Sequence, residues 1–317
     1  MEFISESPEH HFLVIAEKVK AGKGAGKGAE KGADKGDWLA ARINFASDID
    51  HKKVLMKPLM IKPVLEELQE KSEALFADFK QDMEAQDDLI VYQFLDGDIV
   101  LLREAKTDDE KRAFTNLYND MQAAAGKDIC EFFDMTKSDY AFHKLVDDKF
   151  IETEKIRAYL SLADVNKLRS IPLRRDRRED PVVLMVEDDA FTAEYAENIL
   201  SKEYTTVIAR SGEEALIAYI EHAPDIVFMD IHLPGLNGHQ TLNTMLRIDP
   251  RAHVVMLSVD AVKDNIVNAN KIGAAGFLKK PFSSDRLVHA VRKSPYVTTV
   301  VAPADPVPDD VVSTSVH

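Results

Sequence analysis

Residues suited to phosphate chemistry follow four apolar segments in the C-terminal part of the chain. Glu187 and Asp188 follow one segment, and Asp230 ends a second. Ser258 and Lys280 come directly after two more. Carboxylates that crowd together repel one another unless a cation neutralises them, and carboxylate oxygens combined with water suit Mg²⁺. A lysine and a hydroxyl beside them could hold a transferred phosphoryl group, so these residue types indicate magnesium-assisted phosphoryl chemistry if the four segments meet.

Five short segments between Pro181 and Lys293 are apolar nearly throughout, and they alternate with amphipathic segments. Continuous apolar character is typical of strands in a parallel sheet whose two faces are both covered. The alternation predicts a doubly wound α/β fold, in which the site lies at the carboxyl edge of the strands. The predicted strands are 182–186, 205–209, 226–230, 253–257 and 276–279, and the predicted helices are 190–202, 212–222, 238–248, 263–272 and 284–293.

Residues 181–294 resemble the receiver domains of two-component response regulators. The likeness rests on the acidic, hydroxyl and lysine residues named above, each at its own strand end, with Pro281 following the lysine. The loop from Leu233 to Gly238 (LPGLNG) also matches the Pro-x-x-x-Gly loop of that family. The resemblance implies a flavodoxin-like domain with a five-stranded parallel sheet, and a phosphoprotein that works in phosphorelay signal transduction.

The resemblance assigns a role to each residue of the acidic site. Asp230 is the expected phosphoacceptor, a carboxylate nucleophile that forms an acyl phosphate. The expected Mg²⁺ ligands are Glu187, Asp188, Asp230 and the backbone carbonyl of His232. Lys280 is expected to pair with Asp230 at rest and with the phosphoryl oxygens afterwards. The domain would catalyse its own phosphoryl transfer and hydrolysis, and no dedicated enzyme is expected.

The resemblance also implies a switch that changes protein–protein interactions. Ser258 would move toward the phosphoryl group and Phe277 would turn inward behind it, which would alter the face formed by residues 263–293. The Lys280–Pro281 peptide is expected to be cis. Val259 departs from the family, which usually has a smaller residue there, so its effect on the rates of phosphorylation and hydrolysis is left open.

Residues 1–148 form a predicted α+β domain of no recognised type. Two apolar segments, Phe12–Val19 and Trp38–Phe45, are interpreted as strands on either side of a mobile Gly/Lys loop at 21–36. Asp88–Arg103 is interpreted as a hairpin with an Asp-Gly turn. Further predictions are a helix at 63–79, a helix at 108–125 that ends at Gly126, and a strand at 129–135.

The segment 149–180 is expected to be a helical connector followed by a charged linker. The apolar spacing predicts helix from Ser138 to Ile171. Pro172–Asp180 (PLRRDRRED) is interpreted as a solvated joint in which three acids offset four arginines, with nucleic-acid binding as the alternative. The tail 295–317 shows no periodicity and is predicted to be disordered.

The composition limits the partners. A formal net charge of −15 over 317 residues makes direct nucleic-acid binding unlikely. No apolar segment is long enough to cross a bilayer and the N-terminus lacks the basic start of a signal peptide, so a cytoplasmic protein is expected. The single cysteine, Cys130, excludes an intrachain disulfide. From the family, the expected partners are a sensor histidine kinase or phosphotransfer protein, an unidentified downstream protein and a second copy of the chain.

Two alternatives to a phosphorylated regulator remain open. One is a receiver-type interaction scaffold that is never phosphorylated. The other is an effector in the N-terminal half, because the hairpin turn Asp96-Gly97-Asp98 resembles a degraded form of the diguanylate cyclase turn. The first Gly and the Glu of that turn are missing here, so the hairpin would belong to a degenerate nucleotide-cyclase-like domain.

Overall fold

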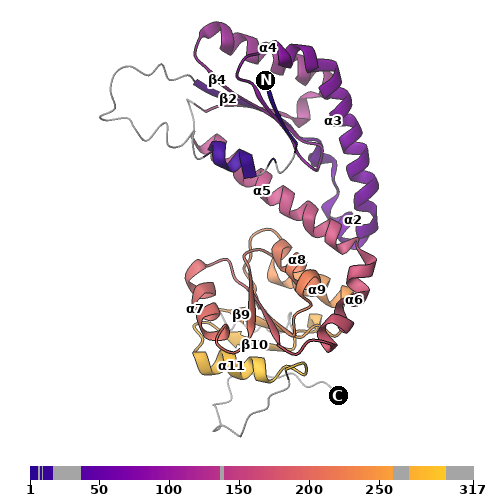
Figure 1. Ribbon diagram of the computed structural model, residues 1–317, viewed down its shortest axis with the longest axis vertical. Helices are drawn as coiled ribbons and strands as arrows, with labels where there is room; N and C mark the ends of the chain where they lie inside the picture. The colour runs from indigo at the N-terminus through magenta and orange to yellow at the C-terminus, as the bar shows by residue number, and fades with distance from the viewer. Residues whose placement is uncertain (6–7, 9, 17–36, 136–138, 260–270, 298–317) are drawn as a thin grey trace, which may run out of the picture. The chain divides into compact units, whose positions relative to one another are not determined.

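The chain folds into two compact units, Met1–Ile156 and Arg157–His317. The computed structural model describes residues 1–5, 8, 10–16, 37–135, 139–259 and 271–297 (Figure 1). Within these ranges no helix is both long and apolar enough to cross a membrane. The expected loop at 21–36, most of the expected helix at 263–272 and most of the expected tail at 295–317 lie outside the described residues.

The N-terminal unit is a five-stranded sheet with helices on both faces (Figure 1). One edge strand pairs in parallel and the other pairings are antiparallel. In sheet order the strands are β1 (Glu2–Ile4), β3 (Ile90–Gln93), β4 (Ile99–Ala105), β2 (Asp37–Ile43) and β5 (Cys130–Asp134). The longer helices are α3 (Ile61–Glu84), α4 (Asp108–Ala125) and α5 (Asp139–Leu162), and short helical turns are η1 (Phe45–Asp48), α2 (His51–Met56), η2 (Pro58–Met60) and η3 (Lys127–Ile129).

One strand prediction in this unit is wrong. Residues 10–16 are helical, whereas Phe12–Val19 was expected to be a strand. The spacing explains the result, because Phe12, Ile15 and Ala16 lie three and four residues apart and pack together against the sheet. The other predicted elements of the unit are present. They are the hairpin, the strands at 37–43 and 130–134, and the helices at 61–84 and 108–125.

The β3–β4 hairpin turns at Gly97, where only glycine fits. Its φ of +83° lies in the left-handed region, and a Cβ there would lie 2.7 Å from the backbone oxygen of Leu68. Gly126, after α4, also has a positive φ of +106°, but a Cβ there would meet no atom within 4 Å. A substitution at Gly126 would therefore cause backbone strain alone, whereas one at Gly97 would cause both strain and a steric clash.

We predict that Gly97→Ala lowers the free energy of unfolding of the N-terminal unit more than Gly126→Ala does. Both variants strain a left-handed residue, and only the first also forces Leu68 aside, so the difference should be at least about 1 kcal/mol. Trp38 is the only tryptophan of the chain and lies in β2, so its fluorescence during urea unfolding follows this unit. Equal losses in the two variants would contradict the steric explanation.

The C-terminal unit contains a second five-stranded sheet, in which all strands are parallel. The doubly wound α/β prediction is confirmed. Helices α7 and α11 cover one face and α8 and α9 the other (Figure 1). In sheet order the strands are β10 (Gly276–Lys279), β9 (Val254–Ser258), β8 (Ile226–Asp230), β6 (Val182–Val186) and β7 (Thr205–Ala209), and the helices are α7 (Ala190–Leu200), α8 (Gly212–His222), α9 (Gly238–Ile248) and α11 (Ser284–Arg292).

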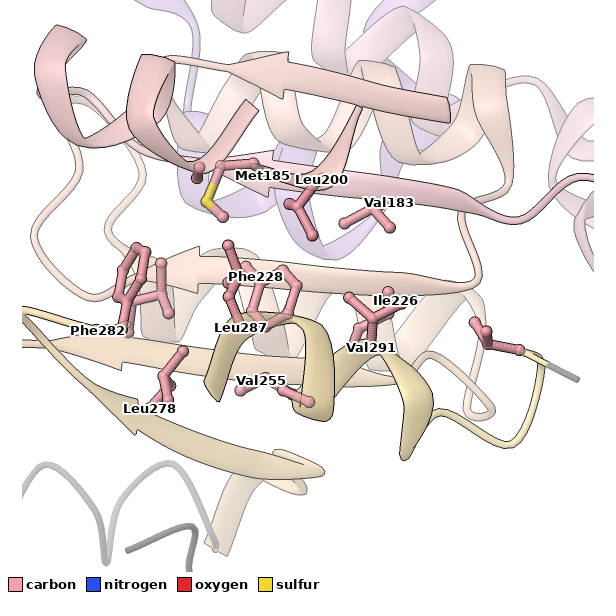
Figure 2. Close-up of a cluster of buried hydrophobic side chains, with 14 residues drawn as sticks. Val183, Met185, Leu200, Ile226, Phe228, Val255, Leu278, Phe282, Leu287 and Val291 are labelled. Atoms are coloured by element: carbon pink, nitrogen blue, oxygen red, sulfur yellow. The ribbon is translucent and has the colours of Figure 1, made fainter. Parts of the chain in front are cut away.

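A continuous apolar core fixes the strand ends of this unit. Figure 2 shows side chains of β6, β8 and β9 on the side of the sheet that α11 covers. Phe228 of β8 and Leu287 of α11 are fully buried in this cluster. Because an apolar core of this size resists any slip in register, the residues that follow the strands are held at fixed positions along one edge.

The expected charged linker is largely helical. After α5, helix α6 (Val165–Asp176) continues through Pro172 and packs against α8. Arg175 is buried, and its Nη2 lies 2.7 Å from Asp249 Oδ2. Tyr219 also donates to Asp249, at 2.8 Å. The solvated-joint interpretation was wrong because it treated all the arginines as equivalent, whereas the helix turns Arg175 toward the C-terminal unit.

We predict that Arg175→Met lowers the free energy of unfolding of the C-terminal unit by about 3 kcal/mol, because Asp249 stays buried without its cation. Arg177→Met is the matched control, since Arg177 is exposed and belongs to the same arginine-rich segment. Differential scanning calorimetry of the full chain measures both. A solvated linker would give two variants with the same unfolding temperature.

Candidate functional site

Acidic and basic side chains converge at the carboxyl edge of the C-terminal sheet. Asp230 is the last residue of β8, Glu187 follows β6, and Lys280 follows β10. Lys280 Nζ donates to Asp230 Oδ2 at 2.6 Å and also forms an ion pair with Glu187. Carboxylate oxygens of Glu187, Asp188 and Asp230 all lie within 4.8 Å of one another. The strand ends therefore meet as the sequence predicted.

Burial sets the electrostatics of this group. Glu187 is almost fully buried, which raises the pKa of its carboxyl to about 7 even though Lys280 favours the charged form. Burial alone would lower the pKa of Lys280, but the hydrogen bond from Lys280 to Asp230 and the ion pair with Glu187 outweigh burial and raise it. The lysine therefore stays charged, and its single positive charge is shared between two carboxylates.

The donor set fits a hard divalent cation. Three carboxylates from two neighbouring strands face one ammonium group, so the group retains negative charge. Asp188 is exposed, which leaves one side of the group open to water. Mg²⁺ prefers this combination of a few carboxylate oxygens with room for water ligands.

The remaining predicted site residues surround this group. Ser258 ends β9 and is fully buried, and Phe277 in β10 is buried. His232 is exposed, and its backbone N–H donates to Asp230 Oδ1 at 3.3 Å. The Lys280–Pro281 peptide is cis, as predicted. The functional roles expected for these residues remain predictions.

The loop between Asp230 and α9 packs tightly against its strand. Gly238 lies against the backbone oxygen of Asp230, which leaves no room for a Cβ. The Asn237 side chain accepts the backbone N–H of Gln240 at 3.0 Å and so caps α9. The C-terminal end of the predicted Pro-x-x-x-Gly loop is therefore fixed against β8 and at the start of α9.

Comparison with known proteins identifies this unit. The response regulator receiver domain model matches residues 183–292. The chain is 35% identical to the chemotaxis protein CheY of Bacillus subtilis over 114 residues, which are 35% of this chain and 95% of that protein. It is 37% identical to CheY of Thermotoga maritima over 113 residues, 35% of this chain and 94% of that protein. The chain belongs to the response regulator receiver family.

Among solved structures, the receiver domain of NtrX from Brucella abortus is 34% identical and has a TM-score of 0.33, with 35% of this chain and 99% of that chain covered. The family match places the receiver in two-component signalling. It lies wholly within the C-terminal unit and begins after α6.

The receiver site opens into a pocket of about 630 Å³ with an aromatic wall. Phe191 and Tyr195 of α7 line it and are 84% and 47% exposed, and Val259 lines it as well. Phe191, Tyr195 and Ile199 recur at four-residue spacing, which by itself would predict that they form the buried face of α7. The spacing misleads for Phe191 and Tyr195, because the buried face is formed by the smaller Ala193 and Ala196 with Leu200.

A second group of carboxylates lies in the N-terminal unit, around the hairpin turn. Asp96 and Asp98 are buried, and Lys149 Nζ lies 2.6 Å from Asp96 Oδ1 and 2.9 Å from Asp98 Oδ2. Arg42 donates to Asp98 at 2.8 Å and pairs with Glu152. Burial and then the neighbouring Asp98 raise the pKa of Asp96. Cations of the chain itself fill this cluster, so it is not a candidate metal site.

Proposed function

We propose that the receiver domain accepts a phosphoryl group on Asp230. An Oδ atom of Asp230 attacks the phosphorus of a phosphodonor, the bond from phosphorus to the donor atom breaks, and the leaving group takes the electron pair. The observation that carries the proposal is the convergence of Asp230, Glu187, Asp188 and Lys280 at one sheet edge, in a chain of the receiver family.

Glu187, Asp188, Asp230 and the backbone carbonyl of His232 would hold Mg²⁺. The fit rests on the three clustered carboxylates and on the exposed side of Asp188. Bound Mg²⁺ would neutralise the carboxylates, so that an anionic phosphodonor can approach. Lys280 reaches the same place from β10 and would exchange its bond to Asp230 for one to a phosphoryl oxygen.

Phosphorylation would then switch protein–protein interactions. Ser258 and Phe277 lie on the adjoining strands β9 and β10, where the domain would rearrange around the phosphoryl group. The phosphodonor would be a phosphohistidine of a sensor kinase or of a phosphotransfer protein. The downstream partner would be another protein or a second copy of this chain. The pocket at Phe191 and Tyr195 gives the donor protein an apolar surface beside Asp230.

We predict that acetyl phosphate with Mg²⁺ modifies Asp230 of the full chain, and that Asp230→Asn abolishes the modification. Intact-mass analysis detects the added phosphoryl group, and peptide mapping locates it. Asp285→Asn is the control, because Asp285 is an exposed aspartate of the same unit, in the first turn of α11. If wild-type Asp230 stayed unmodified while another receiver was labelled, the unit would instead be an interaction scaffold that is not phosphorylated.

We predict that Asp188→Asn weakens Mg²⁺ binding about tenfold or more, because one of the few anionic ligands is lost. Asp189→Asn removes the same charge one residue later. The Asp189 side chain is used to cap α7, where it accepts the backbone N–H of Thr192 at 2.8 Å, and asparagine preserves that bond. Isothermal titration calorimetry with Mg²⁺ measures both variants, and equal affinities would exclude Asp188 as a direct ligand.

A further inference from the structure

Helix α8 contacts the phosphoacceptor loop, which is residues 231–238 after Asp230, at one end and the connector at the other. The connector is defined here as residues 157–176, which comprise the end of α5 and helix α6 and precede the part that matches the receiver family. The connector lies outside the family match, which therefore gives it no role.

At its N-terminal end, α8 binds the loop through the side chain of Glu213. This residue is buried, and both its carboxylate oxygens lie 3.1 Å from the backbone nitrogen of Leu236, which donates to them. Gly235 has a φ of +71° and lies so close to the Glu213 carboxylate that no Cβ would fit. Gly212 is equally close to the backbone oxygen of Leu236. The loop that leaves Asp230 is therefore held against the start of α8 by a buried charge.

The charge of the same carboxylate also acts on the connector. Tyr159, near the end of α5, is buried, and burial followed by the charge of Glu213 raises the pKa of its hydroxyl. Ala158 and Leu162 of the same helix end are buried as well. Glu213 thus binds the loop, and its charge also acts on a tyrosine of the connector.

At the C-terminal end of α8, arginines of α6 bind its last carbonyl groups. Arg174 donates to the backbone oxygens of Ile220 and Glu221 at 2.5 and 2.6 Å. Arg175 donates to the hydroxyl of Tyr219 at 2.7 Å. Positive charge at a helix C-terminus and negative charge at its N-terminus both stabilise the helix.

We propose that α8 couples the phosphoacceptor loop to the connector, with Glu213 as the positioning residue that binds the loop, and with the arginines of α6 as the contacts at the opposite end. A rearrangement of the loop around Asp230 then reaches the chain segment that leads to the N-terminal unit. The coupling between loop and connector is a property of the resting protein. Only its use in signalling rests on the proposed phosphorylation of Asp230.

Hydrogen–deuterium exchange of the full chain tests the coupling without any phosphodonor. We expect Glu213→Ala to raise amide exchange about fivefold or more in 231–238 and also in 157–176, the lower limit of a typical coupling between sites. Glu194→Ala is the matched control, because Glu194 is an exposed glutamate in α7. Faster exchange in the loop with unchanged exchange in the connector would overturn the proposal.

A second variant tests the coupling from the opposite side and is less disruptive. Tyr159→Phe removes only the hydroxyl on which the charge of Glu213 acts, and by reciprocity it should raise exchange in 231–238. Unchanged exchange in that loop, in a folded protein, would also overturn the proposal.

The signalling use of the coupling is tested with acetyl phosphate and Mg²⁺. When intact mass shows that Asp230 is modified, exchange in 157–176 should change in the wild type and stay constant in Glu213→Ala. Modification without any change in 157–176 would refute the signalling use while leaving the proposed function intact. If Asp230 stays unmodified, the proposed function and the signalling use both fail, and the donor-free variants still decide the coupling.

Discussion

The contacts of Lys280 with Asp230 and Glu187 are the interaction on which the C-terminal site depends. Two carboxylates about 4 Å apart repel each other by about 4 kcal/mol at the effective dielectric constant of a protein surface. Lys280, which follows strand β10, offsets that repulsion at the ends of β6 and β8. Under the proposed function, Lys280 would exchange its bond to Asp230 for one to a phosphoryl oxygen. The resting arrangement would then be one of the two states of a switch.

The N-terminal unit contains a comparable cluster of carboxylates around a lysine, but this cluster is buried and stabilises the fold. Lys149 is 1% exposed in its side chain, against 11% for Lys280, and it lies 4.5 Å from the ring centre of Phe94. Asp96 and Asp98 are enclosed with it, and Arg42 contributes a second cation. With two cations and with Asp96 and Asp98 buried, this cluster fastens α5 to the hairpin. The composition of the two clusters is similar, and access to water distinguishes the candidate site from the structural cluster.

The sequence predicted the receiver site well because each of its residues follows a strand whose position is fixed by continuous apolar character. Parallel topology then brings Glu187, Asp230 and Lys280 together without any knowledge of side-chain packing. The errors have a different origin. The segment 12–19 is apolar enough for either a strand or a helix, and only its three- and four-residue spacing favours the helix. The large side chains of α7 mislead in a similar way, because the buried face is formed by Ala193, Ala196 and Leu200 and not by Phe191.

The arginine-rich segment shows what sequence patterns cannot supply. Arg175 and Arg177 each stand between Asp176 and another arginine, so their sequence surroundings are alike. Only the packing of α6 against α8 decides that Arg175 is buried and Arg177 exposed. Arg174 of the docked α6 binds carbonyl groups at one end of α8, an 11-residue helix about 16 Å long, and Glu213 lies at the other end, where it binds the loop. A helix that is charge-complemented at both ends moves more readily as a rigid body than it unwinds. Under the proposed coupling, displacement of the Asp230 loop would move α8 together with the arginines of α6 that bind its last turn.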